Sequence, residues 1–155
     1  MKRIAISVGL AVLVAASALA QQHIVITPSG ARPTIYGPPQ AYTGRAVADT
    51  LVAPNDPSHV MAVNITFEPG ARTAWHNHPA GQYLIVTSGV GWVQERGGKK
   101  REVHPGDVIW TPPGVAHWHG ATAKNAMSHL AVWEFVDGSG GQLMEHVSDA
   151  DYLAE

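Results

Sequence analysis

From residue 59 onward the chain consists of short runs in which apolar residues alternate with small or polar ones. In the first run Met61, Val63, Ile65 and Phe67 share one face, the period of two that is typical of a strand with one buried side. Glycine and proline separate this run from similar ones, so we expect strands at residues 59–67, 82–87, 90–95, 100–103, 108–111, 115–119 and 128–136. Many short, closely spaced strands with such turns predict an all-β fold, a sandwich or a small antiparallel barrel.

The two ends of the chain differ from this central region. Residues 1–20 begin with Lys2 and Arg3, continue as an apolar stretch and end in small residues, the pattern of a secretory signal peptide cleaved after Ala20. An uncleaved anchor is the alternative, but the apolar stretch is short for a membrane span. Residues 21–58 are rich in proline and glycine and predict an N-terminal arm with short strands, one of them at 23–27. We assign residues 59–140 to the barrel and 141–155 to a tail with a short helix that begins at Ser148.

Composition limits the chemistry that is available. The chain has no cysteine, which excludes thiol catalysis, thiolate metal ligands and disulfides. It has 10 basic and 12 acidic residues, and cleavage of the signal peptide would remove two of the basic ones. A mildly acidic surface gives no reason to expect nucleic acid or an anionic membrane as a partner. The expected partner is therefore a small molecule, bound in a periplasmic or secreted protein.

The central region is rich in histidine. Six of the nine histidines lie between residues 76 and 129. Alternate residues of a strand share a face, so His76 and His78 point the same way, as do His117 and His119. Imidazoles on the inner face of a barrel need hydrogen-bond partners or a metal ion, because burial without either is costly. A His-x-His pair alone is weak evidence for a metal.

Both histidine pairs lie within a longer pattern. The first segment has Gly70, then His76-Asn77-His78 after five residues, Gln82 after three more and Gly89 after six more. The second has Gly106, then Pro112-Pro113-Gly114 after five residues and His117 after two more. In these two motifs the chain resembles the single-domain cupins, which are small antiparallel barrels or jelly rolls. The resemblance implies that His76, His78, Gln82 and His117 bind one divalent metal.

The chain departs from the usual cupin pattern at two of these positions. The third ligand is usually glutamate, where this chain has Gln82, and the second motif usually closes with asparagine, where it has Ala121. A glutamine oxygen can coordinate but brings no charge, so the ion keeps its full double positive charge and is a stronger Lewis acid. Four protein ligands would complete a tetrahedral zinc site, whereas manganese or iron would keep two positions open. We therefore favour manganese or iron, with zinc or nickel possible.

Over residues 65–155 the chain resembles the small bacterial manganese cupins that act as hydroxynitrile lyases. The resemblance rests on the stretches "ITFEPGARTAWHNHPAGQYLIVTSG", "HPGDVIWTPPGVAHWHGA", "MSHLAVWEFVDG" and "MEHVSDADYL". It implies that His129 is a proton-transferring base, with His119 and Thr73 as polar partners. The implied substrate pocket is formed by Val63, Ile65, Ala131 and Trp133. Those lyases have a smaller polar residue in place of Trp133, which would shrink the cavity or stack on an aromatic substrate.

Two other functions are compatible with the same residues. A neutral ligand set with open positions also suits oxygen, which makes an iron-dependent dioxygenase the first alternative. A periplasmic cupin that binds a small molecule without turnover is the second. Cupins of this size are commonly dimers or tetramers, so we expect a homo-oligomer in which the N-terminal arm covers the edge of a neighbouring sheet.

Overall fold

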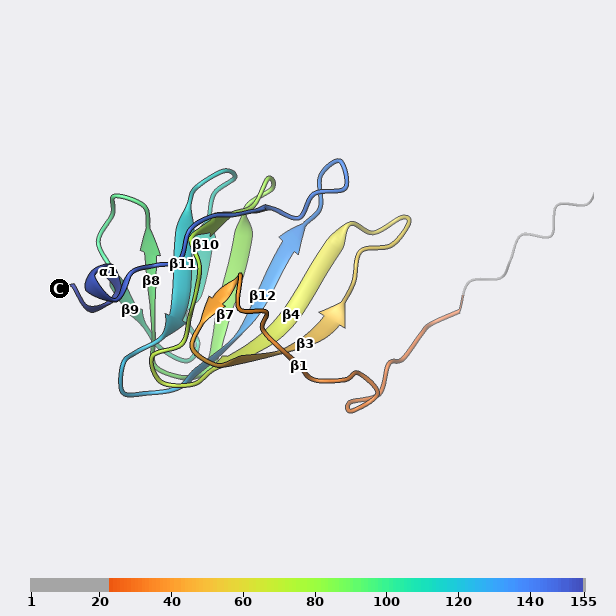
Figure 1. The fold of residues 1–155 in the computed structure, drawn as a ribbon. Coiled ribbons are helices and arrows are strands. Elements are labelled where there is room, and N and C mark those ends of the chain that lie inside the picture. The colour runs from red at the N-terminus through yellow and green to blue at the C-terminus, as the bar shows by residue number, and fades with distance from the viewer. Residues whose placement is uncertain (1–22, 155) are drawn as a thin grey trace, which may run out of the picture.

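Two curled antiparallel sheets form the protein (Figure 1), which a computed structural model describes over residues 23–154. The first sheet has the strand order β1 (Ile35–Tyr36), β3 (Ala46–Val52), β4 (Val60–Phe67), β12 (Met127–Glu134), β7 (Gln82–Gly89) and β10 (Val108–Thr111). The second has the order β13 (Gln142–Leu143), β6 (His76–Asn77), β11 (His117–Ala121), β5 (Arg72–Thr73) and β2 (Tyr42–Thr43), with β8 (Gly91–Glu95) beside β11 and β9 (Arg101–Val103) beside β8.

The all-β prediction is confirmed, and so are the strands of the central region. All seven expected strands are present, and each begins within two residues of its predicted start. Alternation of apolar and polar residues predicted these strands because one face of each is buried. In β4, for example, Val63, Ile65 and Phe67 are all at most 6% exposed. The predicted C-terminal helix is α1 (Asp149–Leu153), and the Ser148 hydroxyl accepts a hydrogen bond from the backbone N–H of Asp151 (3.0 Å).

The N-terminal arm differs from the prediction in two respects. Residues 23–28 form no strand. In contrast, β3, which we assigned to the arm, is a full member of the first sheet and pairs with β4 from Ala46 opposite Phe67 to Val52 opposite Ala62. The barrel therefore begins before residue 59. The predicted signal peptide lies outside the described residues.

A hydrophobic core fills the space between the sheets, and it leaves room for a polar site at one end. Phe67, Leu84, Met127 and Ala131 are at most 1% exposed and belong to this core. The aromatic ring of Phe67 lies against the imidazoles of His119 (centroid distance 5.9 Å) and His129 (5.5 Å). Phe67 therefore marks the boundary between the apolar core and the histidines.

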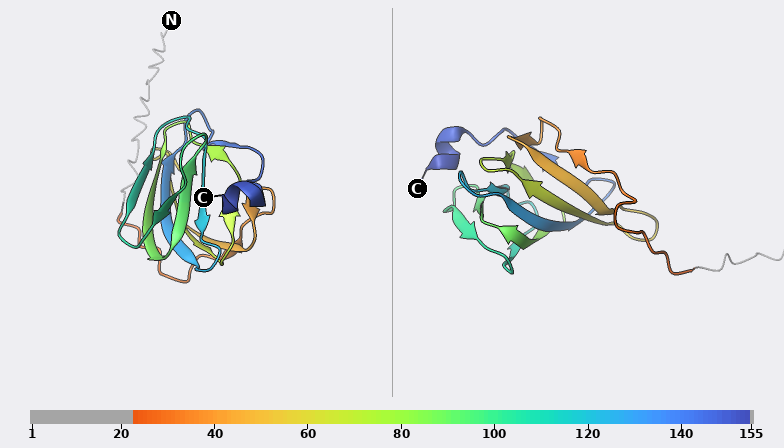
Figure 2. Two further views of the ribbon diagram at one scale, coloured as in Figure 1. Left: turned by 90° about the vertical axis from the view of Figure 1, so that its left-hand side faces the viewer. Right: turned by 90° about the horizontal axis from the view of Figure 1, so that it is seen from below.

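The C-terminal tail crosses the second sheet and ends in α1, at the end of the barrel away from residues 23–34 (Figures 1 and 2). Tyr152 of α1 is buried against Trp118 and Trp92, and its ring lies 4.3 Å from the guanidinium carbon of Arg72. Arg72, itself 4% exposed, also donates to the carboxylate of Asp149 (2.6 Å). These contacts fix the tail against the barrel. Within residues 23–154 no helix has the length and hydrophobicity needed to cross a membrane.

Candidate metal centre and cavity

The short strands of the second sheet bring the predicted metal ligands to one end of the barrel. His76 of β6 lies directly opposite His117 of β11 in the antiparallel register. His78 is the residue directly after β6, and Gln82 is the first residue of β7 in the other sheet. The four predicted ligands thus come from three strands and one loop, and only the curling of the sheets brings them together.

The four side chains lie around a common space. The ring centroids of His76 and His117 are 4.3 Å apart, those of His76 and His78 are 5.2 Å apart, and Gln82 Oε1 lies 2.9 Å from His117 Nε2. His119 is close as well, since its potential ligand nitrogen and those of His76 and His117 all lie within 4.8 Å of one another. This three-histidine cluster can hold a divalent metal ion, and His119 joins it although it was not among the four predicted ligands.

Backbone carbonyls set the tautomer of the three predicted histidine ligands. Nδ1 of His76 lies 2.9 Å from the carbonyl of Ala74, Nδ1 of His78 lies 2.7 Å from that of Gly140, and Nδ1 of His117 lies 3.0 Å from that of Val115. A carbonyl can only accept, so Nδ1 carries the proton in each ring. In the neutral ring Nε2 is then an unprotonated lone pair, which is the form that binds a metal.

Several atoms around this space are hydrogen-bond acceptors that lack a donor, and a cation would satisfy them. His117 Nε2 and Gln82 Oε1 are both acceptors at 2.9 Å, so their lone pairs repel unless a cation lies between them or the amide is turned to present its NH₂ group. His78 Nε2 is buried and has no hydrogen-bond partner among the described residues. A divalent ion would satisfy all of these groups.

Burial keeps the histidines neutral near pH 7. Desolvation, together with the neighbouring imidazole of His117, lowers the pKa of His76 to about 3. Desolvation also lowers the pKa of His117 and of His129 to about 4. The pKa values of His78 and His119 are lowered by the same cause, and that of His119 well below its ordinary value. Each ring therefore offers a lone pair rather than a positive charge.

These pKa shifts predict that the metal-free protein loses stability in acid. Between the ordinary histidine pKa of 6.5 and the lowered values of about 3 to 4, the unfolded chain binds protons that the folded protein does not. Stability is then fully present above pH 6.5 and falls as the pH decreases, by about 1.4 kcal/mol per histidine and pH unit. Urea unfolding of the metal-free protein from pH 7.5 to 4 measures this slope. If the pH dependence of the unfolding free energy were the same in His76→Gln as in wild type, the lowered pKa of His76 would not contribute to it.

The two remaining inward histidines form a pair behind the cluster. His129 Nε2 lies 3.0 Å from His119 Nδ1, so one ring donates to the other. His129 is completely buried, and the pairing of β12 with β7 shifts its register between Ser128 and His129. The other ring nitrogens, His119 Nε2 and His129 Nδ1, are buried without a partner among the described residues. Thr73 Oγ1 accepts the backbone N–H of His119 (3.1 Å) and so holds this part of β11.

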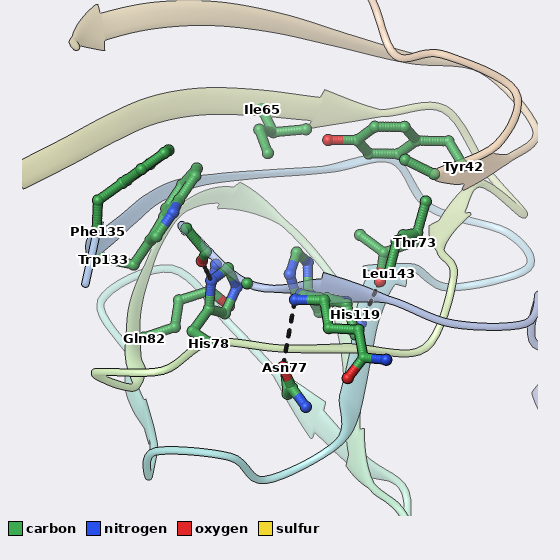
Figure 3. Close-up of a pocket in the computed structure, with 15 residues that line it drawn as sticks. Tyr42, Ile65, Thr73, Asn77, His78, Gln82, His119, Trp133, Phe135 and Leu143 are labelled. Atoms are coloured by element: carbon green, nitrogen blue, oxygen red, sulfur yellow. Dashed lines mark hydrogen bonds between the residues drawn. The ribbon is translucent and has the colours of Figure 1, made fainter. Parts of the chain in front are cut away.

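A cavity of about 370 Å³ opens beside these histidines (Figure 3). Ile65, Thr73, His119 and Trp133 line it, as do three of the predicted ligands, His76, His78 and Gln82. Trp133 leaves this space open because its ring lies against His78, with centroids 5.2 Å apart. None of the described residues that line the cavity is acidic.

Two predicted pocket residues are not on this wall. Val63 and Ala131 have the predicted inward orientation, but they are part of the hydrophobic core and do not line the cavity. The alternation of a strand gives the face of a side chain and not its depth in the barrel, so it could not separate these residues from Ile65 and Trp133. His129 likewise lies behind His119 and is not a lining residue.

The sequence motifs also missed part of the cavity wall. Tyr42 comes from the N-terminal arm, and Phe135, Gly140, Gly141, Gln142 and Leu143 come from the segment after β12. Gly141 has φ +148°, and a Cβ there would collide with the carbonyl oxygen of Asn77 beside His78. The run of glycines at 138–141 was the available signal, but a glycine-rich turn does not by itself reveal that it faces a site.

Comparison with known proteins relates this architecture to a family. Residues 63–133 match the cupin domain. The chain is 53% identical to the (R)-mandelonitrile lyase of Granulicella tundricola over 116 residues, which cover 75% of this chain and 88% of that protein. The chain belongs to the cupin family. The resemblance inferred from the two histidine motifs is thereby confirmed.

Solved structures agree with this assignment. A cupin-like protein from Thermotoga maritima superposes with a TM-score of 0.73 at 37% identity, covering 76% of this chain and 89% of that one. A cupin-2 domain protein of Rhodospirillum rubrum has a TM-score of 0.63 at 15% identity over 84% of this chain and 85% of that one, a likeness of fold alone. The small antiparallel cupin barrel predicted from the sequence is therefore the observed fold.

Proposed function

We propose that this cupin is a metal-dependent lyase of the hydroxynitrile type, which cleaves an aryl cyanohydrin into an aldehyde and hydrogen cyanide. The observation that carries the proposal is a cavity whose polar end consists of neutral imidazoles and uncharged amides, with a histidine pair beside it. The 53% identity to the (R)-mandelonitrile lyase supports the same chemistry.

We propose manganese as the physiological metal, held by His76, His78, Gln82 and His117, with iron as the alternative and zinc or nickel as further candidates. When bound, such an ion supplies Lewis-acid stabilisation for an anionic substrate oxygen. The tautomers of the three histidines support this ligand set, because each has its Nε2 free for the ion. Gln82 adds an oxygen donor without charge, so the ion stays strongly electrophilic.

The His119–His129 pair is the proposed proton acceptor. His119 Nε2 takes the proton of the cyanohydrin hydroxyl, while the proton on His119 Nδ1 passes over the 3.0 Å hydrogen bond to His129 Nε2. The bond between the carbinol and nitrile carbons then breaks. Its electron pair leaves with cyanide, and the carbinol becomes the aldehyde. The proton returns through His119 to cyanide, which gives hydrogen cyanide and restores the pair.

The apolar part of the cavity would bind the aryl group of the substrate. Ile65, Trp133, Phe135 and Leu143 provide apolar and aromatic surface next to the polar end. Offset or edge contacts with Trp133 and Phe135 would hold an aromatic ring. About 370 Å³ is enough for a substrate of this size.

Metal analysis and one assay test the proposal. The mature protein is purified, its metal content is measured, and samples loaded with manganese, iron, zinc or nickel are supplied with mandelonitrile. We expect the manganese form to release benzaldehyde well above the buffer rate. Release no faster than buffer at full manganese occupancy would exclude the lyase. Oxygen consumption by the iron form with a diketone or flavonol would instead indicate the dioxygenase, and binding without turnover would indicate a binding protein.

We also propose that residues 1–20 are removed on export and that the mature protein is a homo-oligomer in the periplasm or outside the cell. The exposed arm supports the second point, because Ile24, Val25 and Ile26 are each more than 80% exposed. N-terminal sequencing of the protein from cell fractions tests the cleavage after Ala20. Light scattering measures the molecular mass in solution, and the mass of a monomer would contradict the proposed homo-oligomer.

A further inference from the structure

Tyr42 is held at the cavity by the part of the chain that the histidine motifs do not cover. It begins β2 and lies opposite Thr73 of β5. Its ring packs on Phe67 with centroids 6.0 Å apart. Its backbone N–H bonds to the carbonyl of Pro38 (3.2 Å), and Gly37 lies so close to the ring that a Cβ there would collide with it. The position of the ring is therefore fixed from both sides.

The hydroxyl group of Tyr42 is the part that faces the cavity. In Figure 3 its oxygen points past Thr73 and towards Ile65, over the open space and across from His78 and Gln82. No hydrogen bond joins this oxygen to another described residue. Burial raises the pKa of Tyr42, so the phenol keeps its proton and is a hydrogen-bond donor at neutral pH.

The two sides of the cavity therefore offer opposite chemistry to a bound molecule. The histidine side presents imidazole lone pairs together with the amides of Asn77 and Gln142, and on the side of Ile65 the phenol of Tyr42 is the polar group. The Thr73 hydroxyl already accepts the N–H of His119 and lies nearer the histidines. A ligand whose oxygen faces the histidines would place a second polar group on the opposite side within reach of Tyr42.

We propose that Tyr42 is a catalytic residue whose hydroxyl donates a hydrogen bond to the nitrile nitrogen of the cyanohydrin. This inference rests on the proposed lyase function, because the hydroxyl of the substrate must face the histidine pair. When the carbon–carbon bond breaks, its electron pair goes to the nitrile carbon and negative charge develops on the cyanide. A donor at the nitrogen stabilises this charge more strongly than it stabilises the neutral nitrile. No proton is transferred to or from Tyr42.

Substitution of Tyr42 by phenylalanine removes the hydroxyl and keeps the ring that packs on Phe67 and Gly37. Because a hydrogen bond to a charged group is lost, we expect kcat to fall by roughly tenfold to a hundredfold, with little change in KM, metal content or thermal midpoint. Tyr83→Phe is the matched control, since Tyr83 is 48% exposed and does not line the cavity. It should keep wild-type kcat.

A spectroscopic measurement tests the hydrogen bond without turnover. Phenylacetonitrile, which lacks the hydroxyl and cannot be cleaved as a cyanohydrin, is bound to the metal-loaded protein and its nitrile stretch is recorded. A nitrile that accepts a hydrogen bond absorbs at higher wavenumber, so wild type and Tyr83→Phe should show a shift that Tyr42→Phe lacks. The same nitrile frequency in all three proteins, or no binding by wild type, overturns the role of Tyr42. A shift that depends on Tyr42 in a protein without lyase activity would uphold the hydrogen bond and overturn only the proposed reaction.

Discussion

Replacing His76 with alanine is expected to remove the bound divalent metal and to lower cyanohydrin cleavage by about a thousandfold or more. His76 has this effect because it is central to the cluster: its ring centroid lies 5.2 Å from that of His78, 4.3 Å from that of His117 and 5.2 Å from that of His119. His117 is likewise in ring contact with the other three histidines, so these two rings form the centre of the cluster. Metal content of the purified variant, measured beside its activity, checks the prediction.

A surface histidine provides the control for this substitution. His104 has an exposed side chain whose ion-pair partner is Glu102, so His104→Ala should keep both metal and activity. His76→Ala opens space in the barrel, and its circular dichroism and thermal midpoint must therefore be compared with those of metal-free wild type. Full metal occupancy in a folded His76→Ala protein would show that His76 is not a ligand.

The fold could be predicted from the sequence because its strands have one buried face. The period of two in β4, β7 and β12 fixed which residues point inward, and glycine or proline marked the turns. The same rule predicts that His76 and His78 share one face of a strand, and that His117 and His119 do so too. The partnership of His76 with His117 is a different matter. Their partnership across β6 and β11 depends on pairing between distant segments, for which the cupin resemblance supplied the expectation.

The remainder of the site comes from segments without a periodic pattern. Tyr42 lies in a region of proline and glycine, and Gly140, whose carbonyl orients His78, lies just after a turn. Tyr42 has no local signal for its role, and the glycines around Gly140 indicate a turn without showing that it faces a site. Each residue acts through contact with strands far away in the sequence. Strand alternation also does not predict how deep in the barrel a side chain lies. Val63 and Ile65 share a face of β4, but of the two only Ile65 reaches the cavity.

The C-terminal tail connects the stability of the barrel to the metal centre. β13 pairs with β6, so that Leu143 lies opposite His76, and the carbonyl of Gly140 fixes the tautomer of His78. The tail is itself held by Arg72, which contacts both Asp149 and the ring of Tyr152. Residues outside the histidine motifs thus determine whether His78 presents its lone pair to the cavity.

Replacing His129 with glutamine is expected to leave metal binding intact and to lower kcat by about a hundredfold to ten-thousandfold, the range for loss of a general base. Glutamine is close to histidine in size and can still hydrogen-bond to His119, but it cannot take up a proton. This design limits the cavity that alanine would leave at a completely buried position. The parallel variant His119→Gln should lose activity to a similar extent, because the two rings act through one 3.0 Å hydrogen bond.

The pH profile separates this role from a structural one. Burial lowers the pKa of His129 to about 4, so the pair stays neutral and able to accept a proton down to that pH. In wild type kcat/KM should hold from neutral pH down to about 4 and fall below it, as the pair becomes protonated. His129→Gln should lack this acid limb and show only a low, flatter rate. If the variant keeps wild-type kcat with full metal occupancy, the base is another group. If it keeps the acid limb at reduced rate, His129 only positions His119, and His119 alone takes the proton.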